Sequence, residues 1–195
     1  MPALFKNLSI GARLGLGFAL VIVFIAALVI PLVITEFSST IKQAQQRELK
    51  GLFETAQAEI RAEGRLAEAM SVAISHIPDV GQAMAEGNRE RLAEMTRPIF
   101  PPLEQDFGAR QFHFHLPPAV SFFRVHKPEK HGDDLSGFRN TVLATNNRQE
   151  RVRGLERGVA GLGMRGISPI SYQGAHQGSV EFGMSFGQPF FDTFK

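Results

Sequence analysis

The chain has 195 residues, no cysteine and a formal net charge of +2. Of its 21 Lys and Arg residues, Lys6 and Arg13 precede the first acidic residue, Glu36, so residues 35–195 carry 19 basic and 19 acidic side chains. This balance excludes a basic surface that could neutralise nucleic-acid phosphates, and no nucleic-acid partner is expected. The absence of cysteine excludes disulfides and thiolate metal sites.

The run from Leu14 to Ile34 contains no charged residue. As a helix it would be about 30 Å long, which is the thickness of a bilayer's hydrocarbon core. The basic residues Lys6 and Arg13 before it, and Glu36 after it, place the N-terminus in the cytoplasm by the positive-inside rule. A cleaved signal peptide would have a shorter apolar core and a small-x-small cleavage site. The sequence therefore predicts an uncleaved transmembrane helix over residues 14–35.

Residues 36–77 contain no proline and predict one long helix that continues from the membrane segment. Its apolar residues recur at steps of three, four or seven, which gives a narrow apolar stripe. Two interpretations stay open: the stripe packs against its own domain, or it forms the seam of a homodimer. The stripe comprises Leu49, Leu52, Ala56, Ile60, Ala67, Met70, Ile74 and Ile77.

Short helices are expected after this stalk. Proline disfavours helical backbone in the residue before it, so Pro78 ends the long helix and a short one should follow. Asn88 is a candidate N-cap for a helix over Arg89–Met95. We expect Pro98, Pro101 and Pro102 to break the chain again before residues 103–107.

Alternating residues then indicate strands. Gln111–Leu116 alternates strictly and predicts a strand with one Phe face and one His face. Pro117 and Pro118 end it, and a second strand is expected at Ser121–Val125. Asp133 or Asp134 could cap a short helix over 138–144.

Three more strands are expected at Arg153–Val159, Gly163–Ser171 and Gln177–Phe186, the last two joined by a turn at Gln173–Gly174. The order of elements predicts an α+β sheet domain carried on a helical stalk. The Gly-rich run from Gly158 to Gly163 precedes no predicted helix, so it is no dinucleotide loop. It is expected to let the backbone turn or pass close to a ligand.

The opening FKNLSIGARLGLGF resembles the N-terminus of bacterial methyl-accepting chemotaxis proteins. The segments IPDVGQAMAEGNRERL, FFRVHKPEKHGDDLSGFR and GMRGISPISYQGAHQGSVEFGMSF resemble the Cache class of PAS-like sensor domains. The resemblance implies a PAS-like antiparallel sheet in a periplasmic signal-transduction receptor, anchored in the bacterial inner membrane by one helix. The expected layout is a cytoplasmic N-terminus (1–13), a transmembrane helix (14–35), a stalk helix (36–77), a sensor module (78–188) and the start of a following segment (189–195).

The resemblance also implies site residues. Related sensor kinases for citrate and C4-dicarboxylates carry an Arg and a His before a Pro and a Gly-Asp loop, and a second Arg before a T-P-I-like strand. Arg124, His126 and Arg165 match these positions, although the Arg-to-His spacing is one residue shorter here. The neighbouring Lys127 and Ser168 are further candidates for ligand contact. The expected ligand is a small anionic metabolite, because the planar Arg fork binds a carboxylate with two parallel hydrogen bonds.

His113 and His115 share one strand face, so they are candidates for lining the pocket or, alternatively, for holding a metal or haem. A protein-interaction module without a small-molecule pocket is a further alternative. No cofactor is expected. No enzyme is expected either, since the serines lack the context of a catalytic nucleophile.

Overall fold

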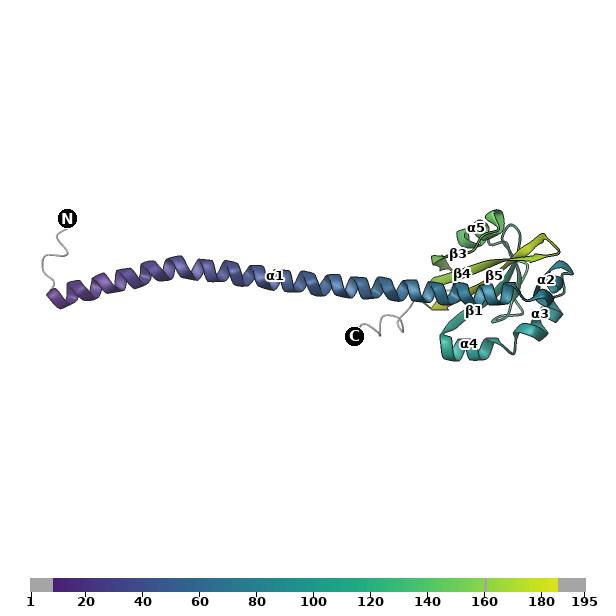
Figure 1. The fold of residues 1–195 in the computed structure, drawn as a ribbon, viewed down its shortest axis with the longest axis horizontal. Helices are drawn as coiled ribbons and strands as arrows, with labels where there is room; N and C mark the ends of the chain where they lie inside the picture. Colours follow the sequence, from purple (N-terminus) through teal and green to yellow (C-terminus); the bar gives the residue numbers. More distant parts are fainter. Residues whose placement is uncertain (1–8, 160, 186–195) are drawn as a thin grey trace. The chain divides into compact units, whose positions relative to one another are not determined.

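The structure, a computed structural model, describes residues 9–159 and 161–185 (Figure 1). The chain divides into two compact units, Met1–Glu54 and Thr55–Lys195. The segment predicted at 189–195, and the last predicted strand residue, Phe186, lie outside the described residues.

In the first unit, residues 10–54 are all helical and belong to α1 (Ile10–Ser75). Pro31 lies inside this helix. By length and composition α1 could cross a bilayer, and no residue of its most apolar 18-residue stretch is buried in the protein. Apolar side chains such as Phe18, Phe24 and Leu32 are exposed. A single helix therefore contains both the apolar run and the predicted stalk.

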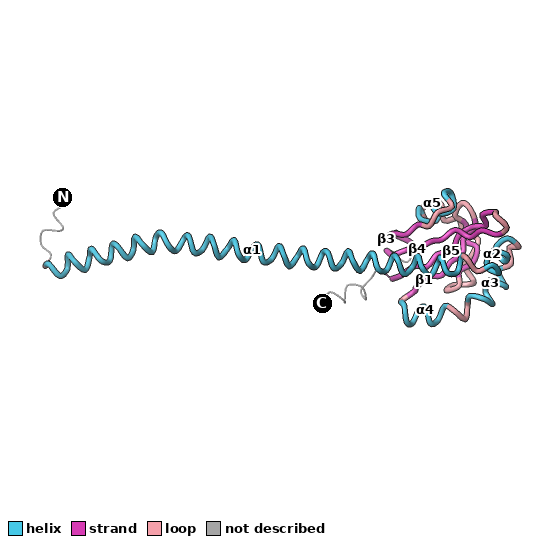
Figure 2. The backbone as a smooth tube through the Cα atoms, viewed as in Figure 1, coloured by secondary structure: helices cyan, strands magenta, loops and turns pink. Residues whose placement is uncertain are grey.

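The described residues of the second unit form the end of α1, four short helices and one sheet. Figure 2 colours the helices cyan and the strands magenta. The sheet has five antiparallel strands in the order β2-β1-β5-β4-β3, which confirms the predicted α+β class. The elements are α2 (Pro78–Ala85), α3 (Arg89–Thr96), α4 (Phe100–Phe107), β1 (Ala109–Leu116), β2 (Val120–Arg124), α5 (Asn140–Arg148), β3 (Val152–Gly158), β4 (Gly161–Tyr172) and β5 (Ala175–Ser185).

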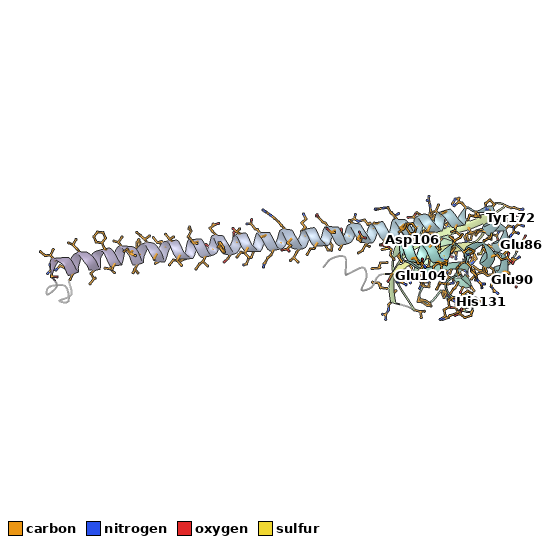
Figure 3. All side chains as sticks on the ribbon, turned by 90° about the horizontal axis from the view of Figure 1, so that it is seen from below. Glu86, Glu90, Glu104, Asp106, His131 and Tyr172 are labelled. Atoms are coloured by element: carbon orange, nitrogen blue, oxygen red, sulfur yellow. The ribbon has the colours of Figure 1, made fainter. Side chains whose placement is uncertain are left out.

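The hairpin between β4 and β5 has the predicted turn at Gln173 and Gly174. Both residues have positive φ, 50° and 78°, which is the conformation of a two-residue type I′ turn. The end of this hairpin lies against α2, where a Cβ at Gly81 would approach Tyr172 to 3.5 Å. Figure 3 labels Tyr172 at the same end of the unit as Glu86, which follows α2.

The predicted Phe face of β1 forms the core. Phe112 stacks on Phe182 of β5 with ring centroids 4.2 Å apart, and it lies 5.3 Å from the ring of Phe114. The last turns of α1 cover this face. Ser71 of α1 donates to the Gly166 carbonyl of β4 at 2.6 Å. A Cβ at Gly166 would overlap the α1 backbone, so only glycine permits this close approach.

The opposite face of the sheet carries the His residues of β1. It is covered by α5 and by the segment between β2 and α5 (Figure 1). A small apolar cluster joins these parts, formed by Ala119, Leu135, Val142 and Ile167. The candidate site lies on this second face.

Two local predictions were wrong. Pro101 and Pro102 lie in the first turn of α4 and do not break it, because proline needs no amide hydrogen-bond partner there. Asp133 and Asp134 do not cap α5, which begins at Asn140 without a side-chain cap. Asp134 instead accepts hydrogen bonds from Ser136, at 2.9 Å from both its amide and its hydroxyl. The Asn88 N-cap is confirmed by its hydrogen bond from the Arg91 amide.

Candidate ligand-binding site

Glu181 of β5 lies at the centre of a buried ionic cluster on the second face of the sheet. Its carboxylate is fully buried and accepts from Arg139 Nη2 at 2.5 Å and from Arg165 Nη1 at 3.0 Å. Burial alone would raise its pKa, but the two arginines outweigh burial and lower the pKa to about 2. Glu181 is therefore ionised at neutral pH and holds both guanidinium groups in place.

Arg139, which precedes α5, connects three elements through this cluster. Besides Glu181 it donates from Nε to Glu156 of β3 at 2.8 Å, and Glu156 also accepts from the amide and hydroxyl of Thr141. The start of α5 is thus fixed to β3 and β5 by charge-assisted hydrogen bonds.

Arg124 of β2 holds the segment that follows it. Its two terminal nitrogens donate to the Asp133 carboxylate at 2.7 and 2.8 Å, and Nη1 also reaches the Lys130 carbonyl at 2.6 Å. The hydrogen bonds from Arg124 lower the pKa of Asp133 to about 2. Asp133 is 37% exposed at its side chain, so this bidentate pair faces partly into solvent.

His113 and His115 form a buried hydrogen-bonded chain behind the cluster. His113 Nε2 lies 2.8 Å from the Ser121 hydroxyl, His113 Nδ1 lies 3.1 Å from His115 Nε2, and His115 Nε2 lies 3.4 Å from Glu181. Burial lowers the pKa of His115 to about 3 and that of His113 well below its usual value. Both rings are therefore neutral at neutral pH.

His126 follows β2 and lies beside these residues. Its Nδ1 is within hydrogen-bonding distance of the Phe112 backbone, 3.1 Å from the carbonyl oxygen and 3.3 Å from the amide nitrogen. Burial lowers the pKa of His126 as well. The backbone contact occupies Nδ1, which leaves Nε2 as the nitrogen available to a ligand.

His113, Arg124, His126, Arg139 and Arg165 line a pocket of about 320 Å³. Four arginines and two lysines line it, and none of its described lining residues is Asp or Glu. Four carboxylates outside the lining pair with these cations, which leaves an excess of two positive charges. They are Glu104, Asp133, Glu156 and Glu181. The lining residues are Arg110, Gln111, His113, Arg124, His126, Lys127, Lys130, Leu135, Phe138, Arg139, Gly158, Val159 and Arg165.

Five of the residues predicted from the sequence share this pocket: His113, Arg124, His126, Lys127 and Arg165. His115 lies behind His113, outside the lining.

Ser168 lies on the other face of the sheet, where its hydroxyl contacts Ser75 of α1 at 2.9 Å. It lines a separate open hollow of about 1020 Å³. Arg151 is the one Lys or Arg among the described lining residues of that hollow, and it is accompanied by Glu68 and Glu150. The hollow is larger than the pocket, but its charges do not favour an anion.

Sequence reasoning missed Arg139, Glu181 and Gln111. Arg139 stands in a predicted helix, and nothing local shows that it reaches Glu181, which is 42 residues away. A signal did exist for Glu181. Phe182 and Val180 belong to the core face of an alternating strand, so the charged residue between them had to lie on the opposite, His-bearing face.

His113, His115 and Glu181 offer three ligand atoms within 4.8 Å of one another, a spacing that suits a metal ion. However, both oxygens of Glu181 already accept hydrogen bonds from arginine. A divalent cation here would add to an existing excess of positive charge, which is unfavourable at a buried position. The arrangement therefore suits an anion better than a metal.

A five-stranded antiparallel sheet with a long N-terminal helix and a small polar pocket defines a Cache-type sensor domain. The chain belongs to the dCache_3 family, described as the double sensory domain of two-component sensor kinases, whose pattern matches residues 42–195. None of the curated protein sequences matches the chain.

Solved structures with the same fold are sensor domains of kinases and chemoreceptors. The sensor domain of the V. cholerae histidine kinase DctB has a TM-score of 0.61 at 11% identity, over 74% of this chain and 57% of that one. The E. coli DcuS sensor domain has a TM-score of 0.55 at 12% identity, over 69% of this chain and 96% of that one. The C. jejuni chemoreceptor Tlp3, solved with isoleucine bound, has a TM-score of 0.50 at 13% identity, over 75% and 61%. The chain thus spans less than two thirds of the DctB and Tlp3 domains.

Proposed function

We propose that this chain is a membrane-anchored extracytoplasmic sensor module that binds a small di- or tricarboxylate in the cationic pocket. The observation that carries this proposal is the charge of the lining: six cations converge on about 320 Å³, and no acidic side chain lines the described part of the pocket. A ligand with two negative charges would balance the excess of two positive charges. Arginine forks bind carboxylates with matched geometry.

The same lining argues against an amino acid as the ligand. An α-ammonium group needs an acidic or carbonyl partner when it is removed from water. Glu181 and Asp133, which pair with cations of the lining, are already engaged by arginines, and the side-chain carbonyl of Gln111 accepts from Arg165. The isoleucine-bound Tlp3 shares the fold, but its ligand has an ammonium group that this pocket does not accommodate.

For the rest of the chain, we propose a single-pass anchor in the bacterial inner membrane with the sensor in the periplasm. Support comes from the exposed apolar residues of α1 between 14 and 34 and from the basic residues that precede them. We also propose a homodimer through α1. Leu49, Leu52 and Phe53 are exposed on this helix, and their burial against a second copy would be favourable.

Ligand binding would transmit a signal only if it favours one arrangement of the module over another. Asp133 offers a means, because it occupies the Arg124 fork that a ligand carboxylate would also use. Displacing Asp133 would release the segment that Arg124 holds through the Lys130 carbonyl.

The test is thermal unfolding of the 195-residue chain in detergent against a panel of organic acids, amino acids and inorganic anions. A ligand at about 100 times its dissociation constant should add roughly 2.7 kcal/mol to the free energy of unfolding. We expect di- or tricarboxylates to raise the melting temperature, and Arg165→Ala to remove this increase. Arg151→Ala, in the hollow on the other face, is the matched control. No shift with any carboxylate would refute the proposal.

A further inference from the structure

Three glycines surround the guanidinium group of Arg165, one from each of β3, β4 and β5. A Cβ at Gly158 would lie 2.8 Å from Nη2, and a Cβ at Gly163 would lie 3.2 Å from both Cζ and Nη2. A Cβ at Gly183 would overlap Nη1. The Arg165 side chain therefore occupies space that other residues at these positions would fill.

The two edges of the Arg165 guanidinium are used differently. Nη1 donates to Gln111 and to Glu181, so this nitrogen is occupied within the protein. Nε is buried without a hydrogen-bond partner, and no described residue accepts from Nη2. The Nε–H and Nη2–H bonds lie on one edge and form a parallel fork that matches a carboxylate. A buried donor without a partner is costly, which favours a ligand at this edge.

We propose that Gly158 is a positioning residue that keeps this free edge of Arg165 open, so that a ligand carboxylate binds through Nε and Nη2. The inference rests on the proposed function of the pocket. Gly158 and Arg165 both line the pocket. An alanine at position 158 would place a methyl group 2.8 Å from Nη2, which is one of the two nitrogens of this fork.

Gly158 gives the cleanest test of the three glycines. Apart from Arg165 and the adjoining residues, the nearest described atom to its Cβ position is the Gly161 carbonyl oxygen at 3.9 Å. An alanine would therefore press on the end of the Arg165 side chain and on no described backbone atom outside the adjoining residues within 3.5 Å. A Cβ at Gly163 would also press on the Met184 carbonyl oxygen, and one at Gly183 would press on Gln111.

Gly154 is a matched control. It lies four residues earlier in β3, on the same face of the sheet and also half-buried. No atom lies within 4 Å of its Cβ position, and neither Gly154 nor Gly158 has a positive φ. Gly154→Ala and Gly158→Ala therefore make the same change to the same strand. Gly154 lies opposite Arg165 in the ladder, but only the Cβ at position 158 would press on the guanidinium.

The experiment is isothermal titration calorimetry of the 195-residue chain in detergent with succinate and with citrate. We expect Gly158→Ala to weaken binding at least tenfold, and Gly154→Ala to bind within twofold of the wild type. Wild-type affinity in Gly158→Ala would overturn the positioning role and leave the proposed function intact. If neither acid binds the wild type, both proposals fail.

A second measurement does not depend on Gly158→Ala. In ¹⁵N NMR spectra of the wild-type chain, the Arg165 Nε–H signal is assigned by its loss in Arg165→Lys. We expect saturating succinate to shift this signal and to slow its exchange with water. An unchanged Nε–H signal, with succinate bound by calorimetry, would show that the carboxylate uses another edge or another residue and would overturn the inference.

Discussion

Arg139 Nη2 donates to Glu181 Oε2 at 2.5 Å, and both side chains are buried. The contact joins the start of α5 to β5. Arg165 of β4 donates to the other carboxylate oxygen of Glu181. One carboxylate thus fixes two of the cations that line the pocket. The arrangement of the pocket therefore depends on an ion pair between residues 42 positions apart in the sequence.

Glu181→Gln should strongly destabilise the second unit. The substitution keeps the shape of the side chain but leaves Arg165 without a carboxylate partner and Arg139 with Glu156 alone, and breaking a buried pair costs about 3–5 kcal/mol. The free energy of unfolding, from urea denaturation, measures this loss. Glu94→Gln, at an exposed position of α3, is the control and should change stability by less than about 0.5 kcal/mol. Equal stabilities of the two variants would contradict the role given to Glu181.

Stability should fall as the pH is lowered below about 6.5. The pKa values of His113 and His115 in the folded protein lie below those in the unfolded chain, so the unfolded chain binds more protons in this range. Each histidine contributes up to about 1.4 kcal/mol per pH unit. His113 and His115 alone should give a slope of roughly 2.7 kcal/mol per unit near pH 5. His126 and His176, whose pKa values burial also lowers, add to this slope. The lowered pKa values of Asp133 and Glu181 add to it below about pH 4.

The measurement is urea denaturation between pH 7.5 and 4.5. His115→Gln should reduce the slope by up to about 1.4 kcal/mol per pH unit. His131→Gln, at the exposed position labelled in Figure 3, should leave the slope unchanged. A flat profile for the wild type would show that the histidine pair titrates normally in the folded protein.

Asp133→Asn should tighten binding of succinate by several-fold. Asp133 occupies both terminal nitrogens of Arg124, and an amide competes for this fork less strongly than a carboxylate does. Arg124→Ala should weaken binding more than tenfold. Calorimetry distinguishes this account from a purely structural one: if Arg124 served only to hold the segment after β2, Asp133→Asn would weaken binding too.

The 195-residue chain should remain in the membrane fraction of a bacterial lysate after an alkaline carbonate wash. The apolar side chains of α1 between residues 14 and 34 are exposed, and transferring them to lipid removes a large apolar area from water. Deleting residues 1–34 should release the protein into the soluble fraction. Release of the full chain by the wash would contradict membrane anchoring.

Much of the second unit could be predicted from the sequence because its strands alternate. Gln111–Leu116 identifies its Phe face and its His face directly, and Gln173–Gly174 defines the hairpin turn. The wrong predictions have a common cause. Both rest on the usual local preference of a residue type: proline breaks helices, and aspartate caps them. Pro101 instead lies in the first turn of α4, where proline is tolerated, and Asp133 instead pairs with Arg124.

The candidate site was only partly accessible from the sequence. Arg124, His126 and Arg165 lie at one pocket, as their resemblance to sensor kinases suggested. The face of Ser168 follows from strand alternation: it lies one residue from Ile167 and therefore points towards α1. The pairing of Arg139 with Glu181 depends on tertiary contact across the sheet, which no periodicity encodes.

The central claim is that the pocket selects a ligand with two carboxylates and no ammonium group. Calorimetric titration of the 195-residue chain with succinate, its monoamide and aspartate tests it most directly. The monoamide lacks one of the two carboxylates of succinate, and aspartate adds one ammonium group to them. We predict that succinate binds, that the monoamide binds at least tenfold more weakly because one charge is lost, and that aspartate is weakened by its ammonium group. Tighter binding of aspartate or isoleucine than of succinate would contradict the account.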